Sequence, residues 1–206
     1  TPPYSSAASD VYKRQVNDIL NSVGQASVTS IDQTNPDVSL AYRTLLSVSR
    51  EVQSEGWSFN KEYDVQFSVD SVTKKIAVPP DVINIDATKE YYQYDTVVRN
   101  DFLYDRCEQT DIFDVDFIKC NVTRLYDFDN LPQYVKDYIV ARAAAVTSTR
   151  IVGDPTQYQL LKEREVEARS RLLENDCNTG DYSFFGYENG KQNYYTPYQP
   201  FRALQR

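Results

Sequence analysis

The 206-residue sequence contains no histidine and no methionine, only three cysteines and only six glycines. Histidine is the commonest general base and metal ligand, so its absence argues against most acid–base and metal-dependent active sites. The odd number and wide spacing of the cysteines (Cys107, Cys120 and Cys177) disfavour a zinc site and predict free thiols. No glycine follows the spacing of a phosphate-binding loop. We therefore expect no cofactor, no metal and no enzymatic activity.

Long apolar runs are also absent. No segment approaches the roughly 20 apolar residues that cross a bilayer, so we expect no membrane insertion. The net charge is −8, and clustered Lys and Arg are missing, which disfavours specific binding of nucleic acid.

The negative charge is concentrated in the middle of the chain, where residues 61–130 hold 15 acidic and 8 basic residues. These acids are scattered, and no pair stands out as the two carboxylates of a glycosidase. The spacing of three of them also differs from an EF-hand calcium loop. The acids that we single out as a surface facing a channel are Asp101, Asp105, Glu108, Asp111, Asp114 and Asp116.

Aromatic residues, by contrast, are abundant, with 17 Tyr and 9 Phe. Tyrosine combines a large apolar area with a polar tip, which favours proteins that bury much interface. Eight aromatics gather near the end of the chain without helical or strand periodicity. This segment either docks on a neighbouring subunit, the interpretation we favour, or folds back over its own helices. Its aromatic residues are Tyr182, Phe184, Phe185, Tyr187, Tyr194, Tyr195, Tyr198 and Phe201.

Helical periodicity appears in two pairs of segments. The first helix begins near Val16 and ends at Gly24, and the second runs from Pro36, with Asn35 as N-cap, to Glu55. Two further helices are predicted between Asp129 and Gly153 and from Pro155 to about Glu174.

Between these pairs the period changes to that of strands. Residues 63–69 alternate apolar and polar side chains, and short strands are predicted at 76–78 and 82–85. Residues 97–104 and 115–126 offer longer strands, which gives four to six antiparallel strands in total.

The pattern predicts an α+β fold: a four-helix bundle with an antiparallel β-domain inserted between helices 2 and 3, plus an extended C-terminal tail. Residues 1–15 are interpreted as an N-terminal arm or as a non-native segment, because residues 5–15 resemble translated sequencing-adapter sequence. The remaining segments are residues 16–60 (helices 1 and 2), 61–129 (β-domain), 130–177 (helices 3 and 4) and 178–206 (the Tyr-rich tail).

Three blocks of sequence resemble the tail tubular protein A family of short-tailed bacteriophages, the head-to-tail adaptors. The most specific block is SREVQSEGWSFN at residues 49–60. The others are VNDILNSVGQA at 16–26 with NPDV at 35–38, and LPQYVKDYI at 131–139 with ARAA at 141–144 and VGD at 152–154. The resemblance spans roughly residues 16–174 and is weak over 63–128 and in the tail.

The resemblance implies a structural virion protein in the tail at the capsid vertex, assembled in the host cytoplasm. Such proteins form a dodecameric ring beneath the portal that leads into a nozzle of tail tubular protein B. Tail fibres attach near that junction, and double-stranded DNA passes through without specific binding. An acidic wall suits such a channel because it repels phosphates. Two alternatives remain, a tail-associated polysaccharide hydrolase and an assembly chaperone or scaffold.

Overall fold

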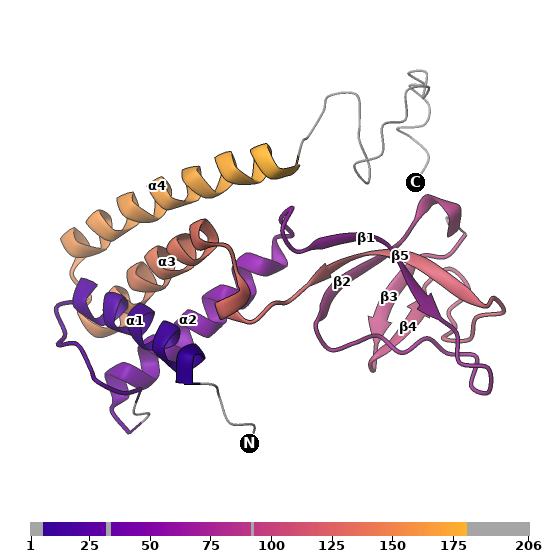
Figure 1. Cartoon of the computed structure of the whole chain (residues 1–206), viewed down its shortest axis with the longest axis horizontal. Helices are drawn as coiled ribbons and strands as arrows, with labels where there is room; N and C mark the ends of the chain where they lie inside the picture. Colours follow the sequence, from indigo (N-terminus) through magenta and orange to yellow (C-terminus); the bar gives the residue numbers. More distant parts are fainter. Residues whose placement is uncertain (1–5, 32–33, 92, 181–206) are drawn as a thin grey trace. The chain divides into compact units, whose positions relative to one another are not determined.

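The computed structural model describes residues 6–31, 34–91 and 93–180, which form a mixed α+β protein (Figure 1). They divide into two compact units. The helical unit comprises the residues up to Glu55 together with Tyr126–Thr179, and the β unit comprises Gly56–Leu125. The elements in chain order are α1 (Ser6–Ser22), α2 (Pro36–Ser54), β1 (Lys61–Ser68), β2 (Val82–Ala87), η1 (Lys89–Tyr91), β3 (Thr96–Arg99), β4 (Phe102–Asp105), β5 (Phe117–Arg124), η2 (Phe128–Asn130), α3 (Gln133–Ile151) and α4 (Pro155–Gly180).

In the helical unit, α1, α2 and α3 pack against one another, and α4 runs beside α3 (Figure 1). Each of the first three helices contributes an apolar stripe to a common core, as the periodicity predicts. The longest helix, α4, buries fewer of its apolar side chains and exposes several others. Core residues include Val16, Ile19, Leu20, Val38, Leu45, Val52, Val135, Tyr138, Ile139, Leu161 and Leu172.

The ends of the helices follow local chemistry. The Asn35 side chain accepts a hydrogen bond from the amide of Asp37, and Pro36 occupies the first turn of α2, so the predicted start of this helix is confirmed. After α1, Gly24 has a φ of 80°, and the amide of Gln25 donates to the carbonyl of Leu20. This is a left-handed C-terminal cap, which glycine adopts without steric strain.

The start of α1 differs from the expectation. The periodicity predicts a first helix from near Val16, whereas α1 begins at Ser6, within the segment interpreted as an arm or as non-native. The Tyr12 ring lies against the rings of Tyr42 and Phe128, with centroids 5.8 and 5.6 Å apart. Burial, with a smaller contribution from Asp129, raises the pKa of Tyr12 to about 12. Polar and small residues before Val16 weaken the helical periodicity of this stretch, although the Tyr12 side chain packs in the helical unit.

The β unit contains a three-stranded antiparallel sheet, in the order β1-β5-β2, and a hairpin of β3 and β4. One apolar core serves both, with Ile85 and Ile118 from the sheet and Leu103 from the hairpin. The single strand predicted over 97–104 is wrong. Asn100 and Asp101, with φ values of 50° and 64°, form a tight turn that divides it into two strands. The short strand predicted at 76–78 is reduced to one bridge, from Ala77 to Phe102.

The buried side chain of Gln53 joins the end of α2 to the segment that follows the β unit in the sequence. The Gln53 amide donates to the Tyr126 carbonyl at 3.0 Å and accepts from the Tyr126 amide at 2.8 Å. It also donates to the Ser49 hydroxyl at 3.2 Å. Gln53 is 0% exposed, so its side-chain amide is shielded from water. The pair therefore fixes where the chain leaves α2 and where it re-enters the unit.

Candidate interaction surfaces

The six acids singled out in the sequence have different surroundings. Asp101 occupies the turn between β3 and β4, and Glu108, Asp114 and Asp116 are also exposed. Asp111 is partly exposed and forms an ion pair with Lys75. These five therefore present carboxylates at the surface of the β unit from three separate segments.

Asp105 does not belong with them, because its side chain is buried, with 1% exposure. Its Oδ1 accepts hydrogen bonds from the amides of Asp95 and Cys107, both at 3.0 Å. The carboxylate thus organises the turn after β4 and does not face solvent. Sequence alone gives no sign of this, because the burial depends on the packing of the hairpin.

Several basic residues of the β unit pair with its own acids. Arg124 pairs with Glu62 and Asp81, and both partners raise its pKa. Arg106 pairs with Asp95, and Lys119 pairs with Glu90. The positive charges are therefore neutralised locally, and the surplus of acids sets the character of the surface.

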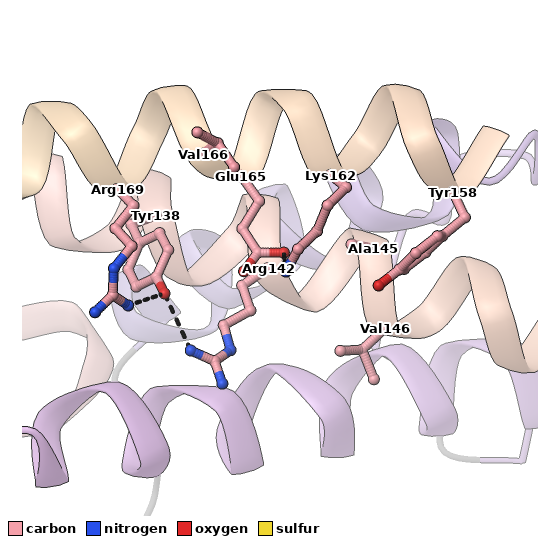
Figure 2. A pocket seen from close by; sticks show the side chains of 9 residues that line it. All are labelled: Tyr138, Arg142, Ala145, Val146, Tyr158, Lys162, Glu165, Val166 and Arg169. Atoms are coloured by element: carbon pink, nitrogen blue, oxygen red, sulfur yellow. Dashed lines mark hydrogen bonds and ion pairs between the residues drawn. The ribbon is translucent and has the colours of Figure 1, made fainter. Parts of the chain in front are cut away.

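One groove lies in the helical unit between α3 and α4, with a volume of about 390 Å³ (Figure 2). Figure 2 shows Arg142 and Arg169 directed at the hydroxyl of Tyr138, which accepts from them at 3.0 and 2.8 Å. Arg169 also pairs with Glu55 at 3.1 Å, and Arg142 pairs with Glu51. These contacts connect α4 to α2 and α3.

The charges in this groove compensate one another. Lys162 and Glu165 form a further pair at 2.8 Å, and the carboxyl side chain is almost buried. In the described part of the chain, no group of three or more His, Cys, Asp or Glu side chains is placed to hold a metal ion. The groove is therefore best explained as a polar contact between helices.

Another groove, of about 720 Å³, lies in the β unit between β2 and β3. Its wall combines apolar side chains with hydroxyls and carboxylates. The residues that line it are Ile83, Asn84, Ile85, Asp86, Ala87, Thr88, Tyr94, Asp95, Thr96, Val97, Val98, Arg106 and Cys107. This is the largest groove described in the β unit, and no sequence pattern indicates it.

The aromatic segment near the end of the chain lies outside the described residues. This applies to all eight residues of the predicted interface, Tyr182, Phe184, Phe185, Tyr187, Tyr194, Tyr195, Tyr198 and Phe201. Over the ranges that are described, no helix is long and apolar enough to cross a membrane.

Comparison with known proteins agrees with the three sequence blocks. A family model described as "Tail tubular protein" matches residues 14–182, which is most of the chain. The chain belongs to the tail tubular protein family. A curated relative, "Tail tubular protein A" of Klebsiella phage KP34, is 26% identical over 159 residues, covering 77% of this chain and 82% of the relative. The family resemblance is thereby confirmed, and with it a structural component of a bacteriophage tail.

Proposed function

We propose that this tail tubular protein is a ring-forming adaptor that joins the capsid portal to the tail nozzle and lines part of the channel through which DNA leaves. The observation that carries the proposal is the family match across residues 14–182, which spans both units. The expected partners are further copies of the chain in a dodecamer, the portal, a nozzle of tail tubular protein B, and tail fibres. The expected location is the virion tail at the capsid vertex, after assembly in the host cytoplasm.

Exposed apolar side chains on α4 support lateral contacts between subunits. Val166 and Leu173 are 57% and 45% exposed, and their spacing of seven residues places them on one side of the helix. Closing a ring requires two different faces on each subunit that meet in a head-to-tail manner. We assign this side of α4 to one of those faces.

The acidic surface of the β unit supports the channel. An acidic wall repels phosphates over about one Debye length, roughly 10 Å in physiological salt, so DNA slides without binding. Asp101, Glu108, Asp114 and Asp116 are exposed and suit this role, and Asp111 contributes in part. Asp105 is removed from the set because it is buried.

Domain organisation follows from the order of the elements. We infer that α1–α4 act together as one four-helix domain in the ring, with the β unit as an insertion between α2 and α3. The pairing of Gln53 with Tyr126 and the contacts of α4 with Tyr138 favour this arrangement. The Tyr-rich tail, residues 178–206, is assigned to contacts with neighbouring subunits.

Negative-stain imaging of the purified chain, alone and mixed with its portal ring, tests the proposal. We expect rings that stack coaxially on the portal. Absence of any association would refute the adaptor role. Digestion of host polysaccharide by the purified chain would instead support a hydrolase, and absence of the protein from mature virions by mass spectrometry would support an assembly chaperone.

A further inference from the structure

The groove between β2 and β3 is bounded by two strand edges. On its other side β2 pairs with β5, and β3 pairs with β4, so the two strands belong to separate sheets. Arg99 and Phe102 are the hydrogen-bonded pair that flanks a two-residue turn. From there, hydrogen-bonded and non-hydrogen-bonded pairs alternate along β3 and β4. Thr96 and Val98 consequently direct their backbone N–H and C=O groups away from β4. An extended segment can use such an edge for main-chain hydrogen bonds.

Two buried hydroxyls on the wall of this groove lack partners. Thr88 and Thr96 are 7% and 3% exposed, and the hydroxyl of each has no hydrogen-bond partner among the described residues. A buried polar group without a partner is unfavourable and is rare in native proteins. Both threonines line the groove, so a ligand that brings polar groups into it would satisfy them.

Charge on the wall points to a basic ligand. Asp86 is exposed, and its electrostatic interaction with Arg106, on the same wall, is weaker than that of Asp95. Asp95, at the other side, is paired with Arg106. The surrounding unit carries a surplus of acids, so the groove favours a segment with positive charge and without carboxylates.

The end of the chain has this composition. Residues 189–206 contain Lys191, Arg202 and Arg206 and no acidic residue. The same stretch holds Tyr194, Tyr195, Tyr198 and Phe201, whose rings suit the apolar part of the wall. Tyrosine hydroxyls and main-chain groups can both hydrogen-bond to threonine hydroxyls.

We infer that the groove between β2 and β3 receives residues 189–206 of a neighbouring copy of the chain. The inference rests on the proposed ring, in which a tail that binds the next subunit links successive copies. An extended chain spans up to about 3.3–3.6 Å per residue, so a tail that begins after Gly180 has a reach on the order of 90 Å.

Disulfide trapping tests this in the full-length chain, because Cys107 is a free, exposed thiol on the groove wall. In a Cys177→Ser background, one set of chains keeps Cys107. A second, differently tagged set carries Cys107→Ser with a single cysteine in the tail, Asn193→Cys, Thr196→Cys or Gln199→Cys. These three positions leave the tail aromatics intact. We expect a disulfide-linked heterodimer on mild oxidation of the mixed chains for at least one position.

Two controls separate specific docking from collision. A synthetic peptide of residues 189–206 should suppress the heterodimer, whereas a scrambled peptide of the same composition should not. Thr96→Val should slow trapping about tenfold, the effect of one lost hydrogen bond, without lowering the reactivity of Cys107 toward a small thiol reagent.

Three other outcomes would count against the groove inference or against the adaptor role. For chains that carry Cys107 and the tail cysteine together, a disulfide found only within one chain would show that the groove holds its own tail. Rings that stack on the portal without any trapping at Cys107 would refute the groove and leave the adaptor role intact. Failure to form rings on the portal would refute the adaptor role itself.

Discussion

Replacing Gln53 by leucine should destabilise the helical unit. The leucine side chain has nearly the same volume but leaves the amide and carbonyl of Tyr126 without the partners that Gln53 supplies. An unsatisfied buried polar group costs about 1–3 kcal/mol. The two hydrogen bonds between Gln53 and Tyr126 are only partly buried, so the lower end of that range applies. For two groups we expect a loss of about 2–3 kcal/mol in the free energy of unfolding.

Urea unfolding followed by circular dichroism at 222 nm measures this loss. With a slope of about 2 kcal/mol per molar urea, the midpoint should fall by roughly 1 M. Gln53→Glu should be at least as destabilising at neutral pH, because its buried carboxylate still accepts from the Tyr126 amide but faces the Tyr126 carbonyl without a proton to donate. Gln133→Leu is the matched control, since the Gln133 side chain is exposed and, among the described residues, hydrogen-bonds to Asp137 alone, and we expect a change within about 0.5 kcal/mol. A Gln53→Leu midpoint equal to that of the unchanged chain would refute the reasoning.

Three further predictions concern the β unit. Thr96→Val should raise the free energy of unfolding of the isolated chain by about 1 kcal/mol, since it removes a buried hydroxyl without a partner. Thermal unfolding of the free chain measures this, and a lower midpoint for the variant would contradict it. Burial raises the pKa of the Cys120 thiol to about 12, so it should stay protonated and unreactive toward Ellman's reagent at pH 8, where the two exposed cysteines react; urea should release the third thiol. Because burial raises the pKa of Cys120 above its unfolded value, the protonated thiol contributes fully to the stability of the fold below about pH 9. This contribution to stability is lost as the pH rises toward 12. Asp114→Asn with Asp116→Asn should slow DNA ejection or make it more sensitive to salt, and unchanged ejection kinetics would exclude a channel role for this pair.

Helix boundaries could be predicted closely where the cap residues are local. Asn35 and Pro36 mark the start of α2, and Gly56 lies just after its end, so the observed helix agrees with the expectation to within a residue or two. The start of α4 was also predicted correctly, with Pro155 as its first residue, whereas the helix runs on to Gly180, past the expected end near Glu174. Capping depends on side chains within a few positions, which the sequence displays directly.

Features that depend on distant segments could not be predicted. The burial of Asp105 arises from its contacts in the turn after β4, and the role of Gln53 requires Tyr126, 73 positions further along. The division of 97–104 into two strands had a local signal, because Asn-Asp tolerates the left-handed backbone of a tight turn. Its flanking β-branched and aromatic residues outweighed that signal in the periodicity.

The position of the β unit within the chain has a consequence for synthesis on the ribosome. α1 and α2 emerge first, but the helix that completes their core, α3, follows only after the roughly 70 residues of Gly56–Leu125. At about 5–20 residues per second, the first two helices wait on the order of 4–14 s before α3 is available. During this interval the apolar stripe of α2 is open to chaperones and to other nascent chains. The β unit, whose strands pair within one continuous stretch, can complete its own core before the helices do.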